Sequence, residues 1–195
     1  MLLVIFLIVC YNVFGDIMRV ISGKYKGKNI EGFNINGTRP TMDRVKESLF
    51  GTIQNYLKDS IALDLFAGSG SLGIEALSNG AKTCYFVDNG REIKKILQKN
   101  LVGIEGSIFM DTDYKNALSN FDKKDIQFDL IFLDPPYYEH LINNSIELIK
   151  EYNLLAPNGI IICEFVDEKI NDYGYELIKD KKYGDKYIHI YKNVK

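Results

Sequence analysis

The sequence of 195 residues is long enough for one domain with a substantial core, and its 46% hydrophobic and 26% charged residues are typical of a globular protein. Its formal net charge of -2 gives no overall signal for nucleic acid. Its three cysteines are an odd number without a C-x-x-C pair, and its two histidines form no cluster, so we expect neither a disulfide framework nor a metal site.

The chain opens with an apolar stretch over residues 1–14. A length of about 14 residues is short for a membrane span, which needs about 20. The stretch also lacks the basic start and small-residue cleavage site of a signal peptide. We therefore expect translation to begin naturally at Met18 and residues 1–17 to be an extension that is not native. A membrane-associating leader and an extra packed strand or helix are the alternatives.

Residues 18–48 carry a local excess of positive charge, with seven basic and three acidic residues. Within this segment, residues 19–23 and 29–33 predict two short strands joined by a basic turn that contains glycine. Lys24, Lys26 and Lys28 of this hairpin are our candidates for contacts with RNA phosphates. A solvated lysine-rich face explains the same charges equally well.

A helix is predicted after this hairpin. Pro40 should hold the preceding residue in an extended conformation, and Thr41 or Asp43 is placed to cap the helix that follows. Arg44 and Lys46 fall outside its apolar stripe, so we expect them to face solvent. The stripe itself consists of residues spaced by four: Val45, Leu49, Ile53 and Leu57.

From residue 61 onward, strand and helix patterns alternate, which predicts an α/β fold with a Rossmann-like, doubly wound sheet of seven mainly parallel strands. A C-terminal antiparallel hairpin closes the sheet, and a small N-terminal β-hairpin and helix precede it. We expect residues 18–58 to face RNA and residues 59–195 to form the catalytic domain. The predicted strands are 61–66, 82–88, 107–110, 128–133, 159–165, 175–178 and 187–191, the last two around a basic turn at 179–186; the predicted helices are 71–78, 91–101, 114–121 and 140–152.

The stretch over residues 61–73 predicts a buried strand that runs into a glycine turn and a helix. Gly68, Gly70 and Gly73 match the spacing of the dinucleotide fingerprint, although that match alone is weak. Asp64 lies within the strand, four residues before the first glycine. A carboxylate there would repel a pyrophosphate and attract an ammonium group, which favours a different ligand.

Acidic residues also stand at the ends of the following strands, where ligands bind in a sheet of this kind. Asp88 follows Asp64 by 24 residues, near the interval of a carboxylate that accepts ribose hydroxyls. Asp113 follows the third strand and could lie beside an adenine, but a helix cap explains it at least as well. Asp134 ends the fourth strand.

The motif Asp134-Pro135-Pro136-Tyr137 is the sharpest signal in the chain. Two prolines stiffen the backbone, so the Pro135 carbonyl and the Asp134 carboxylate can be held as fixed acceptors. These acceptors suit the two N–H groups of an amine on a planar ring, and the aromatic Tyr137 can stack on that ring. A rigid turn at the end of a strand is the alternative.

Together, residues 66–70 (Phe-Ala-Gly-Ser-Gly) and Asp134 to Tyr137 resemble the class I S-adenosylmethionine-dependent methyltransferases that modify exocyclic amines of bases. The segments 19–23 and 39–47 narrow the resemblance to the bacterial family that methylates a guanine N2 in 16S ribosomal RNA, the guanine 966 enzyme. The resemblance runs from Met18 almost to the C-terminus. It implies S-adenosyl-L-methionine as cofactor, 16S rRNA within an assembling small subunit as partner, and a cytoplasmic monomer without a membrane partner.

The resemblance also implies roles for individual residues. Crowding in Asp111-Thr112-Asp113 leaves the adenine contact ambiguous between two carboxylates. Arg39, Thr41 and Arg44 would contact RNA or help close over the cofactor. The catalytic set would be Asp134, Pro135, Pro136 and Tyr137, and the cofactor-binding set would be Asp64, Phe66, Ala67, Gly68, Ser69, Gly70, Asp88, Asn89, Asp113 and Asp134.

Two other functions stay open. The same acidic-proline-proline-aromatic arrangement serves methylation of DNA adenine N6 or cytosine N4, although the chain has little room for a target-recognition segment. A non-catalytic RNA-binding assembly factor could also use this fold, but the intact glycine turn and Asp134 argue against it. We expect His140 to have a helix-start or surface role.

Overall fold

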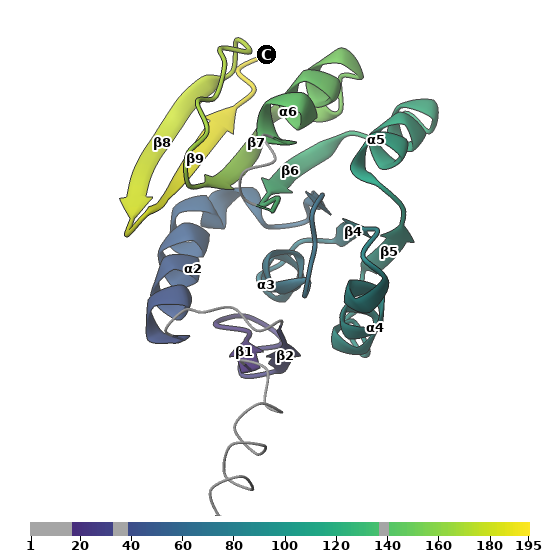
Figure 1. Ribbon diagram of the computed structural model, residues 1–195, viewed down its shortest axis with the longest axis vertical. Helices are drawn as coiled ribbons and strands as arrows, with labels where there is room; N and C mark the ends of the chain where they lie inside the picture. The colour runs from purple at the N-terminus through teal and green to yellow at the C-terminus, as the bar shows by residue number, and fades with distance from the viewer. Residues whose placement is uncertain (1–16, 33–38, 137–140) are drawn as a thin grey trace, which may run out of the picture.

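The computed structural model describes residues 17–32, 39–136 and 141–195, without the side chains of residues 17 and 39–42 (Figure 1). Within these residues no helix is long and apolar enough to cross a membrane. Residues 1–16, most of the predicted apolar extension, lie outside the described part of the chain, as do Tyr137 and His140.

The described chain forms one seven-stranded sheet and one two-stranded sheet. The strands of the large sheet are β3 (Ile61–Asp64), β4 (Thr83–Asp88), β5 (Ser107–Asp111), β6 (Phe128–Leu133), β7 (Leu155–Phe165), β8 (Glu176–Tyr183) and β9 (Lys186–Lys192). Their order across the sheet is β5-β4-β3-β6-β7-β9-β8. Strands β3 to β7 pair in parallel, whereas β9 is antiparallel to both β7 and β8. The predicted fold class is therefore confirmed.

The chain changes direction across the sheet between β3 and β6. It proceeds outward from β3 through β4 to β5 and then returns to place β6 on the other side of β3. In parallel sheets this reversal opens a crevice at the carboxyl ends of the two central strands, where ligands bind. The topology therefore directs attention to the loops that follow β3 and β6.

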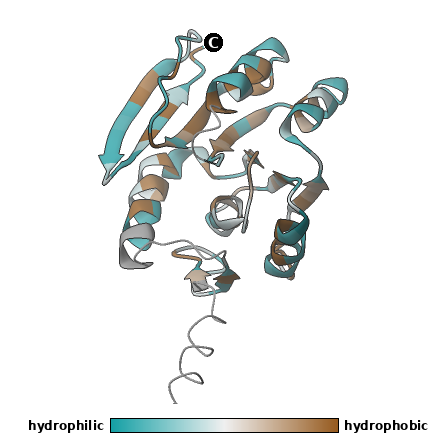
Figure 2. Cartoon of the chain, viewed as in Figure 1, coloured by the Kyte–Doolittle hydropathy of each residue, from teal (hydrophilic) through white to brown (hydrophobic). Residues whose placement is uncertain are grey.

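Helices cover both faces of the sheet (Figure 1). They are α2 (Arg39–Ile53), followed by the 3₁₀ turn Gln54–Tyr56, then α3 (Ser71–Ser78), α4 (Arg91–Asn100), α5 (Tyr114–Lys123) and α6 (Leu141–Glu151). Apolar residues of α2, α3 and α4 pack with Ala62 and Phe86 on one face, and those of α5 and α6 pack with Leu63 and Ile131 on the other. Figure 2 shows that β6 and β7 are mostly hydrophobic, as expected for central strands covered on both sides.

The predicted N-terminal hairpin is present, but residues 20–23, which were predicted to belong to its first strand, lie outside that strand. Strand β1 (Ile17–Arg19) pairs antiparallel with β2 (Asn29–Glu31), and the connecting turn includes the three candidate lysines. Val20 and Ile30 are fully buried and join the core that α2 and α3 share with the sheet. The hairpin is thus packed on the body of the domain by its apolar side.

The start of α2 corrects one prediction. Arg39 is the first residue of the helix rather than an extended residue before it, and Asp43 lies inside the helix instead of capping it. A proline in the first turn of a helix is tolerated because its missing N–H would have no helical partner there. Asp43 instead forms an ion pair with Arg19 at 3.1 Å.

The basic segment over residues 179–186 corrects another prediction, because it is mostly strand rather than turn. Strand β8 continues to Tyr183 and only two residues separate it from β9. Since β8 is the edge of the sheet, lysines can extend into solvent from it without burial. Lys181 and Lys182 also lie over the rings of Tyr183 and Tyr187, at 4.7 and 4.8 Å from the centroids.

Strand β7 also differs from its prediction. It begins at Leu155 rather than at residue 159. The pairing of β6 with β7 shifts register, because Leu155 lies opposite Phe128 and the next pair is Ile160 with Leu130. Residues 156–159 therefore form an irregularity without partners in β6, and Asn158 within it has a φ of 61°, which is typical of a turn.

Candidate active site at the carboxyl edge of the sheet

The glycine turn after β3 is tied to the two neighbouring strands. The Leu65 N–H donates to the Phe132 carbonyl of β6 at 3.2 Å, and the Ala67 N–H donates to the Val87 carbonyl of β4 at 3.0 Å. Gly70 has a φ of 82°, and a Cβ atom there would lie 2.7 Å from a methyl group of Leu97. The turn therefore requires glycine at this position and has a fixed placement at the edge of the sheet.

Asp64 is a buried carboxyl group directly below this turn. Its side chain accepts a hydrogen bond of 2.9 Å from the Gly73 N–H in the first turn of α3, and the residue is 2% exposed. Burial, together with the charge of Asp88 and against the effect of the hydrogen bond, raises the pKa of Asp64 from 3.8 to about 7. The ionised form is thus disfavoured until a positive charge lies near it.

Asp88 ends β4 and organises the loop around it. One carboxylate oxygen accepts from the Gly68 N–H at 2.9 Å and the other accepts from the Gly90 N–H at 2.8 Å. A carboxylate oxygen can accept more than one hydrogen bond, so both oxygens keep capacity for the hydroxyls of a ribose. Asn89 follows directly and is exposed at the same edge.

Asp113 serves as the N-cap of α5. One of its oxygens accepts from the backbone N–H groups of Lys115 and Asn116, both at 3.0 Å. This is the alternative that the sequence left open, and a contact of Asp113 with adenine stays a prediction. The other carboxylate considered, Asp111, pairs with Lys94 at 2.5 Å.

Aromatic side chains lie between the glycine turn and α5. The rings of Phe66 and Tyr114 are 5.5 Å apart between centroids, and both side chains are only partly buried. Phe66 therefore links the turn to the start of α5. Ala67 and Ser69 are buried within the turn, so their backbone rather than their side chains is what the turn offers to a ligand.

The loop after β6 begins directly after Leu133 with Asp134, Pro135 and Pro136, which we call the acidic corner. Burial raises the pKa of Asp134 well above its ordinary value, the charges of Glu164 and Asp64 add to this increase, and Lys186 opposes it. Pro135 is buried and Pro136 is exposed.

The two loops leave the same edge of the sheet because β3 and β6 are adjacent and parallel. Asp64 lies opposite Phe132 in this pairing, so Asp134 follows only two residues beyond that point. Asp64 responds to the charge of Asp88, and Asp134 responds to that of Asp64. The sheet thus brings three of the predicted carboxylates into one electrostatically coupled group that favours a cationic ligand.

The predicted RNA-contacting lysines lie at the surface of the hairpin. Lys24 forms an exposed ion pair with Glu105 at 2.7 Å, and Lys28 donates to the Val102 carbonyl at 2.9 Å. Lys26 is exposed and has no side-chain partner among the described residues. Lys24 and Lys28 thus contact the segment between α4 and β5, and Lys24 and Lys26 are exposed whereas Lys28 is half-buried.

The predicted residues of α2 are only partly described. Arg44 is exposed, as expected. Arg39 and Thr41 lie in the first turn of α2, but their side chains are outside the described part of the structure, so their contacts with RNA stay predictions.

The sequence profile described as Conserved hypothetical protein 95 matches residues 18–192, nearly the whole chain. The chain belongs to the Conserved hypothetical protein 95 family.

Two curated relatives are similar to this chain in sequence, and one solved structure is similar to it in fold. YlbH of Bacillus subtilis, provisionally named an rRNA methyltransferase, is 40% identical over 90% of this chain and 98% of its own. "Ribosomal RNA small subunit methyltransferase D" of Haemophilus influenzae is 37% identical over 93% of this chain and 96% of its own. The structure of yhhF from Escherichia coli, provisionally named a methyltransferase, has a TM-score of 0.79 and 29% identity over 91% of this chain and 98% of its own. These relatives confirm the resemblance that the motifs indicated.

Sequence reasoning missed two buried charged residues of this family member. Lys46 was expected to face solvent but is 8% exposed, which makes that prediction wrong, and Glu75 of α3 is 0% exposed. The two form an ion pair at 3.1 Å. A single acidic residue in the otherwise apolar and small sequence of α3 was the available signal, because a lone charge on a buried helix needs a partner.

Proposed function

We propose that this chain is an S-adenosyl-L-methionine-dependent methyltransferase that modifies the exocyclic N2 amine of a guanine in 16S rRNA. The observation that supports this proposal most strongly is the adjacency of β3 and β6, which puts the glycine turn and the acidic corner at one edge of the sheet. The names of the curated relatives support the coarser part of the proposal, methyl transfer to ribosomal RNA. The guanine N2 position rests on the resemblance of the motifs.

The residues of the edge fit this cofactor. Phe66 to Gly70 would enclose its methionine part, Asp88 and Asn89 would hold the ribose, and Asp113 would lie near the adenine. The carboxylates Asp64, Asp88 and Asp134 suit a ligand with an ammonium and a sulfonium group, because opposite charges attract and a nearby positive charge favours an ionised carboxylate. When bound, the cofactor supplies an electrophilic methyl group that an amine can attack without a covalent enzyme intermediate.

Asp134 and Pro135 would orient the target amine. The guanine amine is a weak nucleophile because its lone pair is delocalised into the ring. Two fixed acceptors aligned with its N–H bonds favour the geometry of attack, and the Asp134 carboxylate would take up the proton that leaves. Burial raises the pKa of Asp134, and only the ionised carboxylate can take up this proton, so the positive charge of the bound cofactor would have to act with Lys186 to keep Asp134 ionised. Pro136 would stiffen this corner, and Tyr137 would stack on a base that has left its own stack.

The N-terminal part of the chain would bind the RNA. We propose that residues 18–58 face the RNA and residues 59–195 carry the chemistry. Lys24, Lys26 and Lys28 would contact phosphates, as would the α2 residues Arg39, Thr41 and Arg44. The relatives' names favour RNA over DNA as the substrate of this chain.

The experiment that tests the proposal uses the full chain and labelled S-adenosylmethionine. Deproteinised 16S rRNA, small ribosomal subunits and duplex DNA are incubated separately, and the products are digested to nucleosides and identified by mass spectrometry. We expect N2-methylguanosine from one of the two rRNA substrates. Methylated adenine N6 or cytosine N4 from DNA would overturn the proposal in favour of a DNA enzyme. Calorimetric binding of the cofactor without methylation of any substrate would overturn it in favour of a non-catalytic assembly factor.

A further inference from the structure

The buried carboxylate of Glu75 in α3 binds the N-terminal hairpin through hydrogen bonds. Its oxygens accept from the backbone N–H of Ile21 at 2.9 Å and from the backbone N–H of Ser22 at 2.8 Å. The Ser22 hydroxyl and the Asn79 amide add bonds of 3.1 and 3.2 Å. These donors satisfy the buried charge of Glu75, and three of them belong to the hairpin. The hairpin therefore offsets much of the free-energy cost of burying Glu75.

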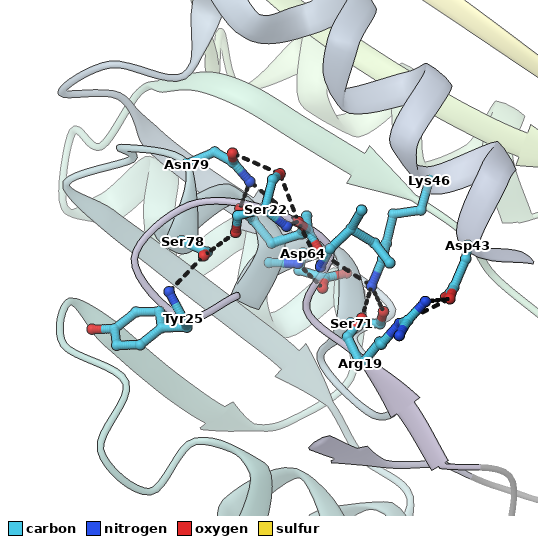
Figure 3. A network of polar contacts seen from close by, with 12 residues as sticks. Arg19, Ser22, Tyr25, Asp43, Lys46, Asp64, Ser71, Ser78 and Asn79 are labelled. Carbon is cyan, nitrogen blue, oxygen red and sulfur yellow. Dashed lines mark hydrogen bonds and ion pairs between the residues drawn. The ribbon is translucent and has the colours of Figure 1, made fainter. Parts of the chain in front are cut away.

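Lys46 of α2 contacts the same group of polar residues, and Figure 3 shows its side chain pointing from α2 toward them. Its ammonium group donates to the Arg19 carbonyl at the end of β1 at 2.8 Å and to the Ser71 hydroxyl at 3.0 Å, besides its ion pair with Glu75. Ser71 is the first residue of α3, directly after the glycine turn. One ammonium group therefore connects α2, the hairpin and the helix that begins at the proposed cofactor site.

The turn of the hairpin contacts the C-terminal end of α3. The Lys24 N–H donates to the Ser78 carbonyl at 2.7 Å, and the Tyr25 N–H donates to the Ser78 hydroxyl at 2.9 Å. A Cβ atom on Gly23 would lie 1.9 Å from the Ser78 carbonyl oxygen, so only glycine permits this approach. Residues 21–25, which include the first candidate lysine, are thus attached to α3 at Glu75 and Ser78.

We propose that Lys46 and Glu75 are positioning residues that hold the N-terminal hairpin in a preorganised place for RNA. This inference rests on the proposed function and adds residues that touch neither the cofactor nor the RNA. A hairpin released from α3 must be ordered again each time RNA binds, and this lowers the affinity for RNA. Within the part of the chain that the structure describes, no bond of Glu75 or Lys46 reaches the acidic corner, and only the Lys46–Ser71 hydrogen bond lies beside the glycine turn, so the chemistry and the binding of the cofactor should depend little on that ordering.

The test compares Lys46→Met and Glu75→Gln with the unmodified full chain in steady-state methylation of the rRNA substrate. We expect the KM for RNA to rise at least about tenfold, while kcat at saturating RNA stays within about threefold and the calorimetric affinity for S-adenosylmethionine stays within about twofold. Hydrogen exchange should show that the Ile21 and Ser22 amides lose protection in both variants. Asp122→Asn is the matched control, because it removes one exposed carboxylate from α5, on the face of the sheet opposite the hairpin, and should leave all these values unchanged.

Ser22→Ala removes only one donor to the Glu75 carboxylate, so it gives a milder variant if the charge-removing ones do not fold. It should raise the KM for RNA by about twofold to fivefold. A KM within the error of the unmodified chain, despite lost protection at Ile21 and Ser22, would overturn the inference. So would unchanged protection, or a loss of cofactor affinity as large as the loss for RNA. Absence of methylation by the unmodified chain would instead refute the proposed function.

Discussion

Replacing Asp64 with Asn should change how the stability of the fold depends on pH. Asn keeps a side-chain oxygen that can accept from the Gly73 N–H, so the hydrogen bond to α3 survives the change. What it removes is a carboxyl group whose pKa is about 7 in the folded protein, compared with an ordinary value of 3.8. The substitution therefore removes the titration of this buried group, together with the part of the raised pKa of Asp134 that the charge of Asp64 causes.

The direction follows from the number of protons that each state binds. Between pH 3.8 and about 7 the folded protein keeps a proton on Asp64 that the unfolded chain has lost, so the free energy of unfolding falls as pH rises through this window. Within this window each pH unit lowers the free energy of unfolding by about 1.4 kcal/mol. The whole window therefore lowers it by about 4 kcal/mol, and the part between pH 5 and pH 8 by about 3 kcal/mol. The free energy of unfolding of Asp64→Asn should therefore rise by about 3 kcal/mol relative to that of the unmodified chain between pH 5 and pH 8.

Urea unfolding at half-unit steps from pH 5 to pH 8 measures this difference. Ser60→Ala is the control, because Ser60 is buried beside the start of β3, donates to the Leu57 carbonyl and does not titrate in this range. Its stability difference should stay constant with pH. A difference between Asp64→Asn and the unmodified chain that varies by less than about 0.5 kcal/mol would refute the assignment of a raised pKa to Asp64.

Three further variants test the glycine turn and the hairpin. Gly70→Ala should destabilise the fold by about 1 to 3 kcal/mol and weaken calorimetric binding of S-adenosylmethionine, because an alanine is strained at a φ of 82°; unchanged affinity would contradict the role of the turn. Asn100→Ala should lower the free energy of unfolding by about 1 to 3 kcal/mol in urea, since its side chain joins β2 to the glycine turn, and a change below 0.5 kcal/mol would show that the link is dispensable. Changing Lys24, Lys26 and Lys28 to Gln should reduce the salt slope of RNA affinity by about 2 to 3, and an unchanged slope would remove the hairpin from the RNA interface.

The parts of the fold that follow from local pattern were predicted from the sequence. The bounds of α3 and β6 are as predicted, because a continuous apolar strand and a helix start after glycine are short-range signals. The placement of Asp64, Asp88 and Asp134 at strand ends also follows from the order of strands and helices along the chain. What required the structure was the sheet order, which makes β3 and β6 neighbours.

The residues that the sequence misplaced depend on contacts between distant segments. Lys46 lies off the apolar stripe of α2, and helical periodicity alone cannot show that Glu75 of another helix pairs with it. The strand character of residues 179–183 likewise comes from pairing with β9 rather than from local propensity, which is weak for a lysine-rich segment. In both cases tertiary contacts override the local preference.

The role of Asp134 is tested most directly by single-turnover methyl transfer with Asp134→Ala, measured beside calorimetric binding of S-adenosylmethionine to the same preparation. Asp134 would orient the amine and accept its proton, so we predict that transfer to rRNA falls by at least about a thousandfold. Cofactor affinity should stay within about fivefold, since we propose that the glycine turn and Asp88 hold most of that ligand. Transfer within tenfold of the unmodified chain would contradict the proposed catalytic role of the acidic corner.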